Sequence, residues 1–200
     1  MDNLAQLCAA REWNPDVARK LGLRDVGRRV RFPARMLGDH EAWWCDRALD
    51  DEPPKWRNAA GREVIPPGLH EAIGPGVELV VCVEGLSDWV AISHVPGVVA
   101  VGIPGAMTFR SDWARLLAYK VVVVVVDNDQ AGSVLADRVT DLLPGAQVVR
   151  PPAWHKDVDD WRRSVGADVF AAEVATVLAS APTVGGNGRA PRSWMLRGAE

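Results

Sequence analysis

Four short apolar runs dominate the middle of the chain, and helical patterns separate them. The runs are ELVVCV (78–83), GVVAVGI (97–103), VVVVVV (121–126) and AQVV (146–149). Residues 87–94, 111–118 and 131–143 have the spacing of apolar side chains that is typical of helices. Strands of a parallel sheet read as continuous apolar runs because both of their faces are buried. The alternation therefore predicts an α/β fold with a parallel sheet flanked by helices.

The segment before these runs is less regular. Asn14-Pro15 is typical of a helix start, with Asn as the N-cap, and Gly22 is a plausible stop. RRVRFPAR (28–35) and AWWCDRAL (42–49) predict two strands, joined by a turn at Gly38-Asp39. Together these elements predict a small mixed α+β N-terminal subdomain.

The C-terminal end divides into a helix and a tail. Residues 168–179 read as a last helix, and the composition of residues 182–200 is that of a flexible tail. We therefore expect four units along the chain: an N-terminal subdomain at 1–76, an α/β domain at 77–165, a C-terminal helix at 166–181 and a flexible tail at 182–200.

Carboxylates follow three of the four apolar runs. Glu84 and Asp88 come after the first, Asp127 and Asp129 after the valines, and residues 156–160 (KDVDD) after the last. Ligands of open parallel sheets sit outside the carboxyl ends of the strands, so these acids should meet at one edge. Two such charges about 4 Å apart repel by roughly 4 kcal/mol, and a divalent cation such as Mg²⁺ or Mn²⁺ removes that cost.

Each acidic group taken alone has a simpler interpretation. Asp127-Asn128-Asp129 is common turn and helix-cap composition, and the KDVDD run is typical of a solvated helix start. Their joint placement after successive predicted strands favours one shared site.

The acids also resemble the motifs of a known family. EGxxD (Glu84, Gly85, Asp88), DxDxxG (Asp127, Asp129, Gly132) and KDxD (Lys156, Asp157, Asp159) are similar, in order and placement, to the Toprim domain of bacterial-type primases, topoisomerases and small nucleases. The resemblance implies a Rossmann-like sheet and catalytic roles for Glu84, Asp127 and Asp129. It implies a metal-binding face made of Glu84, Asp88, Asp127, Asp129, Asp157 and Asp159. VGIPGAM (101–107) is similar to the family's glycine-containing turn after the second strand.

Composition narrows the class of protein. The 200 residues are 48% hydrophobic with a formal net charge of −3, so any nucleic-acid surface must be local. The N-terminus lacks the pattern of a signal peptide, and no apolar run approaches the roughly 18 residues of a membrane span. Three isolated cysteines (Cys8, Cys45, Cys82) fit neither a disulfide framework nor a zinc site, so we expect buried thiols in a cytoplasmic protein, in the host cytoplasm if it is phage-encoded.

Basic residues cluster in the N-terminal segment. Within residues 19–35 there are seven against one acid: Arg19, Lys20, Arg24, Arg28, Arg29, Arg31 and Arg35. Such a run is typical of a surface that follows phosphates, or simply of a solvated loop face.

The same segment resembles the front half of the catalytic domain of bacterial and phage DnaG-type primases. The matching residues are Arg29, Phe32-Pro33, Gly38, Arg47, Pro54-Lys55-Trp56-Arg57-Asn58 and Gly61. The resemblance implies that Arg47, Lys55 and Asn58 hold template or nucleotide phosphates, although Lys55 also fits an ordinary loop lysine. Trp56 stands where the family has Tyr and keeps a flat face for stacking on a base. Our full nucleic-acid or nucleotide set is Arg29, Arg31, Arg47, Lys55, Trp56, Asn58 and Lys156.

These resemblances imply a DNA primase, which synthesises short RNA primers on a single-stranded DNA template from ribonucleoside triphosphates with Mg²⁺ or Mn²⁺. A replicative helicase supplied by another chain is a further expected partner, and Arg189, Arg192, Trp194, Met195, Leu196 and Arg197 of the tail could dock it. The alternatives are a Toprim-type nuclease and a non-catalytic DNA-binding or helicase-loading adaptor. A topoisomerase needs a nucleophilic tyrosine in a further domain, and we expect Tyr119 to be a packing residue. A catalytic core this small is similar to a phage replication module.

Overall fold

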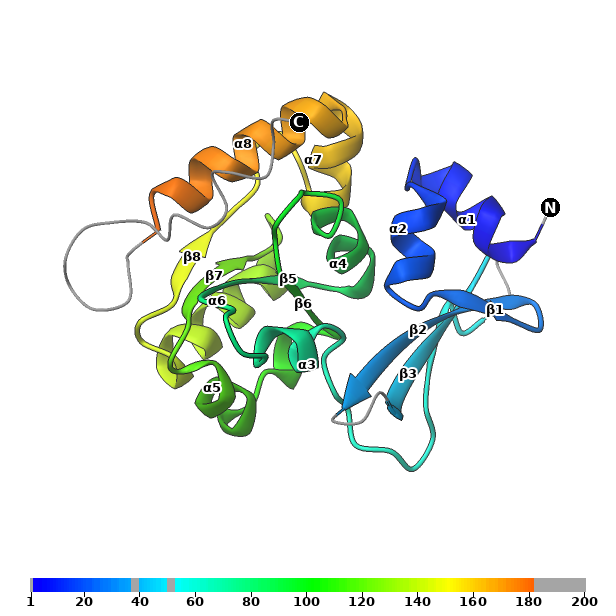
Figure 1. The fold of residues 1–200 in the computed structure, drawn as a ribbon, viewed down its shortest axis with the longest axis horizontal. Helices are drawn as coiled ribbons and strands as arrows, with labels where there is room; N and C mark the ends of the chain where they lie inside the picture. Colours follow the sequence, from blue (N-terminus) through cyan, green and yellow to red (C-terminus); the bar gives the residue numbers. More distant parts are fainter. Residues whose placement is uncertain (1, 37–39, 50–52, 182–200) are drawn as a thin grey trace.

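The computed structural model describes residues 2–36, 40–49 and 53–181 (Figure 1). Each half of the chain builds its own four-stranded sheet, and the two sheets lie side by side. The predicted turn at Gly38-Asp39 and the predicted tail lie outside the described residues. No helix in the described ranges is both long and apolar enough to cross a membrane.

The N-terminal half combines two helices with an antiparallel sheet. The helices are α1 (Asn3–Arg11) and α2 (Pro15–Lys20), and the strands, in sheet order, are β1 (Arg24–Val26), β2 (Arg29–Met36), β3 (His40–Ala48) and β4 (Trp56–Asn58). The predicted start of α2 is confirmed, because the Asn14 side chain caps it by accepting from Asp16 N at 2.8 Å. The sequence analysis did not predict α1, β1 or β4. Strands of three residues, such as β1 and β4, carry too little periodicity to be recognised.

The C-terminal half contains the predicted parallel sheet. Its strands are β5 (Leu79–Glu84), β6 (Ala100–Ile103), β7 (Val121–Val125) and β8 (Gln147–Val149), in the order β6-β5-β7-β8. The connecting elements are α3 (Leu69–Ala72), α4 (Leu86–Ile92), the 3₁₀ helix η1 (Ala106–Thr108), α5 (Ser111–Leu117), α6 (Gln130–Leu142), α7 (Val158–Val165) and α8 (Ala167–Ala179).

Two apolar clusters cover the two faces of this sheet. Val123 and Val125 face the cluster that contains α4, α7 and α8, whereas Val122, Val124 and Val126 face the one that contains α3, α5 and α6. All six valines are buried, which confirms the expectation of a strand covered on both faces. The first cluster continues into α1, α2, β2 and β3, so the two halves of the chain share a core.

Strand order fixes where a ligand can bind. The chain passes from β5 outward to β6, then returns to place β7 on the other side of β5. The carboxyl ends of β5 and β7 therefore flank a topological switch point, the usual position of the crevice in open α/β sheets. A Cβ atom at Gly132 would lie 2.1 Å from the Asp127 carbonyl oxygen, so glycine is required for α6 to begin this close behind β7.

Two expectations for single side chains had different outcomes. The three cysteines are buried and free, as predicted. Tyr119 is 88% exposed, so the expectation that it packs was wrong. It lies in the turn between α5 and β7, at the edge of the sheet opposite the switch point, where the chain leaves the core before the strand begins.

Candidate functional site

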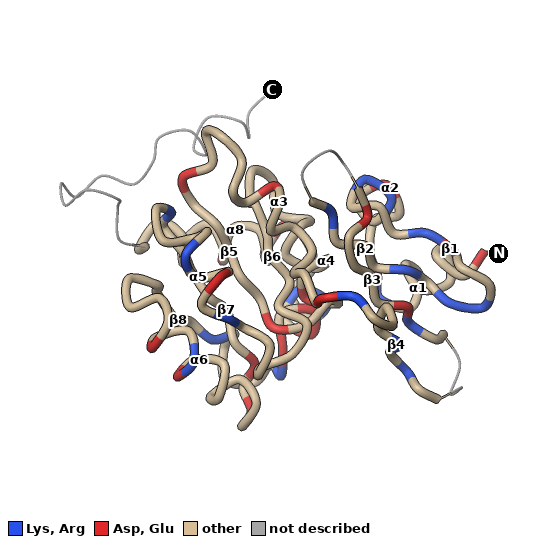
Figure 2. Tube along the Cα trace, turned by 90° about the horizontal axis from the view of Figure 1, so that it is seen from below, with Lys and Arg blue, Asp and Glu red and all other residues tan. Residues whose placement is uncertain are grey.

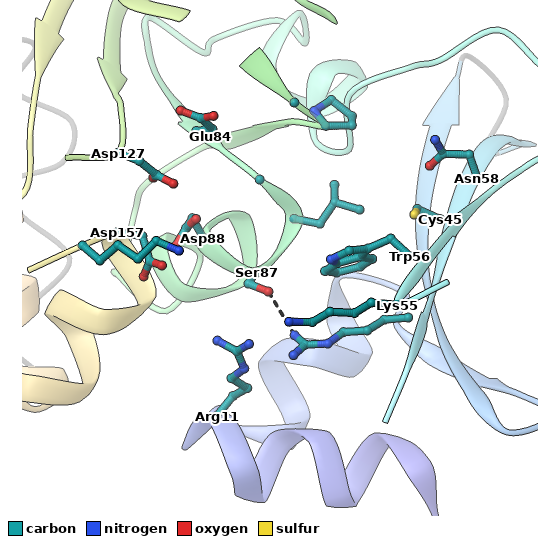
Figure 3. Close-up of a pocket in the computed structure, with 16 residues that line it drawn as sticks. Arg11, Cys45, Lys55, Trp56, Asn58, Glu84, Ser87, Asp88, Asp127 and Asp157 are labelled. Atoms are coloured by element: carbon teal, nitrogen blue, oxygen red, sulfur yellow. Dashed lines mark hydrogen bonds between the residues drawn. The ribbon is translucent and has the colours of Figure 1, made fainter. Parts of the chain in front are cut away.

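A cleft of about 400 Å³ opens where the switch point of the parallel sheet faces β3 and β4. One side carries four carboxylates, which we call the carboxylate wall: Glu84, Asp88, Asp127 and Asp157. The other side carries Cys45, Arg47, Lys55, Trp56 and Asn58, with Arg11 at the base and Lys156 beside Asp157 (Figure 3). Acidic stretches gather at the junction of the two halves, with basic stretches around the N-terminal half (Figure 2).

The carboxylate wall is built by the ends of four neighbouring elements. Glu84 is the last residue of β5, and Asp88 lies in the first turn of α4 directly after it. Asp127 follows β7, and Asp157 caps α7 by accepting from Asp160 N at 2.8 Å. The predicted meeting of the strand-end acids at one edge is therefore observed for these four residues.

Burial and mutual repulsion raise the pKa of three carboxyl groups on this wall. Burial, and then repulsion by Glu84 and Asp157, raise the pKa of Asp127 to about 7. Burial raises the pKa of Asp88 well above its usual range, with Asp157 the next largest cause. Burial also raises the pKa of Glu84. A raised pKa means that the charged form of a carboxyl group is unfavourable, and a nearby cation would stabilise that form.

The donor chemistry of the wall fits a hard divalent cation. Glu84 Oε2 and Asp127 Oδ1 are buried without a hydrogen-bond partner, and both belong to residues that line the cleft. Carboxylate oxygens are the ligands that Mg²⁺ and Mn²⁺ prefer. No three His, Cys, Asp or Glu side chains in the described ranges already stand in ligating geometry. The metal-binding role of these residues therefore stays a prediction.

The opposite wall combines cations with an aromatic ring. Arg47 Nη1 donates to Ser87 Oγ at 3.1 Å, and the Arg47 guanidinium lies 5.3 Å from the centre of the Trp56 ring. Burial, followed by the charge of Arg11, lowers the pKa of Arg47 to about 10. Trp56 also packs edge-on against Phe32, so its position is fixed from behind. This wall thus places positive charge, fixed in position by these contacts, across the cleft from the carboxylates.

Two acids that the resemblance assigned to the metal-binding face lie elsewhere. Asp129 is exposed and caps α6, accepting from Gly132 N at 2.9 Å. Asp159 is buried with both oxygens occupied: Oδ2 accepts from Arg11 Nη1 at 2.7 Å and Oδ1 from Trp13 Nε1 at 2.8 Å. Neither residue lines the cleft.

Asp159 differs from Asp157 because α7 begins between them. Asp157 stays outside the helix as its cap, whereas Asp159 sits in the first turn and points toward α1 and the arginines Arg162 and Arg163. Its backbone N–H donates to Asp88 Oδ1 at 2.7 Å. We therefore correct its assignment as a ligand: it anchors α1 and supports Asp88 from behind.

The basic run of residues 19–35 is mostly used within the protein. Arg31 pairs with Asp46 through Nε at 2.7 Å, and Arg29 Nη1 donates to the Pro54 carbonyl at 2.8 Å. Arg24 pairs with Glu41 at 2.5 Å. Arg29 and Arg31 do not line the cleft, and their place in the predicted nucleic-acid set stays a prediction. The other members of that set (Arg47, Lys55, Trp56, Asn58 and Lys156) do line it.

Sequence reasoning missed several lining residues. Arg11 lies at the end of α1, a helix that was not predicted, so nothing signalled its side chain. Ser87, in α4, and Cys45, in β3, also line the cleft, and no motif in the sequence singled them out. Gly105 was signalled indirectly, since the VGIPGAM turn that resembles the family's glycine turn lines the cleft through Pro104 and Gly105.

Comparison with known proteins gives the fold an independent reference. No protein-family model matches the chain. The gene 57 protein of Mycobacterium phage D29 is 29% identical over 127 residues, a match that covers 62% of this chain and 80% of that protein.

Two solved structures show the fold clearly. The E. coli primase catalytic core matches with a TM-score of 0.69 at 19% identity, over 86% of this chain and 72% of that one. A DnaG primase catalytic domain bound to single-stranded DNA matches with a TM-score of 0.67 at 20% identity, over 86% and 70% of the two chains. The chain therefore has the fold of DnaG primase catalytic cores, and the predicted fold class is confirmed.

Proposed function

We propose that this protein is a divalent-metal-dependent primase that joins ribonucleotides on a single-stranded DNA template. The observation that carries the proposal is the cleft in which four clustered carboxylates, without an ion pair among the described residues, face Arg47, Lys55 and Trp56. Its support from outside the chain is the fold of DnaG primase catalytic cores, among them one bound to single-stranded DNA.

The carboxylate wall would hold the metal. Glu84, Asp88, Asp127 and Asp157 would be its ligands, directly or through water, and we propose Glu84 and Asp127 as the catalytic pair. Bound Mg²⁺ or Mn²⁺ lowers the pKa of an attacking hydroxyl and stabilises charge on a transferred phosphoryl group. The protein itself excludes bulk water from Glu84, which is only 8% exposed, and leaves its Oε2 without a hydrogen-bond partner.

The opposite wall would orient the nucleic acid and the nucleotide. Arg47 is held by Ser87 and stacked near Trp56, so its charge is positioned before a phosphate arrives. Lys55 and Asn58 are exposed at the rim, where they can contact phosphate or sugar. Contacts of this kind fix position and carry no sequence information.

A Toprim-type nuclease is the alternative that the same carboxylates favour, because hydrolysis uses a similar metal site. The basic wall distinguishes the two proposals. A nuclease has no need to hold a nucleoside triphosphate, whereas a primase needs cations for its phosphates as well as for the template.

The test is an assay of the protein with single-stranded DNA, labelled ribonucleotides and Mg²⁺ or Mn²⁺. We expect short RNA products, and at least a hundredfold loss of synthesis in Asp127→Asn, since the removal of one group that stabilises transition-state charge typically costs that much. The matched control is Asp141→Asn, which changes an exposed acid on α6 and should retain full activity. Degraded DNA without synthesis would establish the nuclease, and binding without either reaction would establish an adaptor.

A further inference from the structure

One large aromatic side chain stands in solvent beside the carboxylate wall. Trp154 is 79% exposed and lies on the loop that joins β8 to α7. The same loop ends at Lys156 and Asp157, which line the cleft. Two residues of chain span at most about 7 Å, so the Cα atom of Trp154 lies within that distance of the Cα atom of Lys156. Tryptophan side chains are usually largely buried, so an indole this exposed gains little from packing within the protein.

The loop that carries Trp154 is firmly held. Asn128, between Asp127 and Asp129, donates through Nδ2 to three carbonyl oxygens of the loop, those of Pro151 at 3.1 Å, Pro152 at 3.3 Å and His155 at 2.6 Å. The Asn128 backbone N–H donates to the Lys156 carbonyl at 2.9 Å. Trp154 is therefore positioned by the same residue that separates the two aspartates after β7.

The charges around the indole indicate what it binds. Arg150 and Lys156 are exposed at the two ends of the loop, and Arg150 is oriented by hydrogen bonds to the Asp127 carbonyl and, at 3.0 Å, to Ser133 Oγ. An aromatic face flanked by cations suits single-stranded nucleic acid, whose bases stack while its phosphates are neutralised. Among the large apolar side chains recorded as exposed in the described ranges, this loop contributes Trp154 alone, which is poor support for an apolar protein partner.

From this geometry we infer that Trp154 stacks on a base of the single strand that passes the carboxylate wall, with Arg150 and Lys156 contacting the adjacent phosphates. The inference deepens the proposed function and rests on it for the identity of the strand. It assigns a nucleic-acid contact to the side of the cleft opposite Trp56. A strand would then be held on both sides of the cleft, by the basic wall and by this loop.

The test compares Trp154→Ala with wild type by fluorescence anisotropy of a labelled single-stranded DNA at one fixed salt concentration. We expect roughly five- to a hundredfold weaker binding, the loss of one stacked base. Trp154→Phe should recover most of the affinity. Tyr119→Ala, which removes another exposed aromatic side chain at the opposite edge of the sheet, should bind as wild type does.

A series of DNAs with a single abasic site separates stacking from general effects. At one position the missing base should weaken wild-type binding and have no further effect on Trp154→Ala. Unchanged affinity in Trp154→Ala, or an equal loss on fully abasic DNA, would overturn the inference. RNA of the same sequence distinguishes the source of the base: a loss confined to DNA assigns a template base, and a loss on RNA assigns the nascent primer.

These measurements need no synthesis, so the two proposals can fail separately. If no primer is made but Trp154→Ala weakens DNA binding, the stacking contact stands and the primase does not. If primers are made and Trp154→Ala binds and synthesises like wild type, the primase stands and the stacking contact is overturned.

Discussion

Buried carboxylates occur in two settings in this protein: some are paired with arginines, and others lie beside further acids. Asp159 and Asp46 are each 1% exposed and each is surrounded by arginines. Glu84 and Asp88, at 8% and 6%, are nearly as buried, yet they lie beside other acids on the same side of the cleft. Arginines therefore balance the charges of Asp159 and Asp46, whereas no arginine or lysine among the described residues forms an ion pair with Glu84 or Asp88.

The contrast identifies which acids are structural. A buried charge without a partner is costly, so a fold retains it only where something else supplies the opposite charge. Asp159 receives that charge from Arg11, 148 residues away in sequence, and so ties the N-terminal half to α7. The carboxylate wall has no such ion pair among the described residues, and this is the physical reason to assign the cation to it.

Replacing Asp159 should give the largest effect on stability. In Asp159→Ala, Arg11 and Arg162 lose their carboxylate, and Arg162 is itself buried. Removing one partner of a buried ion pair typically costs about 3–5 kcal/mol of the free energy of unfolding. Urea denaturation should therefore show a much lower midpoint, and the matched exposed variant Asp141→Ala should stay near wild type. A stable Asp159→Ala that has lost its metal-dependent activity would instead return Asp159 to the metal-binding face, as the Toprim resemblance implied.

The assignment of these acids shows how much of the candidate site could be predicted from the sequence. Parallel strands buried on both faces produce unbroken apolar runs, and their carboxyl ends share one edge, so Glu84, Asp88, Asp127 and Asp157 could be brought together from the pattern alone. Asp159 could not be separated from Asp157 in this way. Its partners, Arg11 and Trp13, belong to a segment whose position is set only by packing of the two halves.

The same limit applies to the basic residues. A run of arginines predicts positive charge, but the pairing of Arg31 with Asp46 depends on the register of β2 against β3, where the two residues stand opposite each other. Lys55 and Arg47 lie outside the basic run and were identified by the resemblance alone, whereas charge density favoured Arg31 and both signals favoured Arg29. Local sequence reports charge, and tertiary contacts decide whether that charge is free.

Asp127 should make stability depend on pH in the opposite direction from a paired acid. Its pKa is raised to about 7 in the folded protein, so the folded state binds the proton more tightly than the unfolded state. The resulting stability is complete below about pH 4 and is lost as the pH rises through about 7. After allowance for partial exposure, we expect wild type in chelator to lose roughly 1–2 kcal/mol between pH 5 and 8 relative to Asp127→Asn.

Thermal unfolding at the two pH values measures this difference, which corresponds to about 2–8 °C in Tm for a protein of this size. Saturating Mg²⁺ should remove this pH-dependent loss of stability in wild type, because the bound cation supplies positive charge beside the ionised carboxylates. Equal pH dependence in wild type and Asp127→Asn would mean that the wall is not under electrostatic strain, and the contrast with Asp159 would lose its basis.

The smallest effect on stability should come from Arg57, the more exposed of two arginines that contact Asp46. Asp46 accepts two hydrogen bonds from Arg31, at 2.7 and 3.1 Å, and also contacts Arg57 at 3.4 Å. The Arg57 side chain is 58% exposed, whereas that of Arg31 is 16% exposed and lies 4.3 Å from the centre of the Trp44 ring. Exposed ion pairs contribute little, so Arg57→Ala should change the free energy of unfolding by less than about 0.5 kcal/mol. Arg31→Ala, which leaves Asp46 buried with only the outer arginine, should cost several times more in the same urea titration. Equal costs would show that solvent-exposed arginines compensate buried acids as well as enclosed ones do, and would weaken the argument that burial of the partner distinguishes the structural carboxylates from the carboxylate wall.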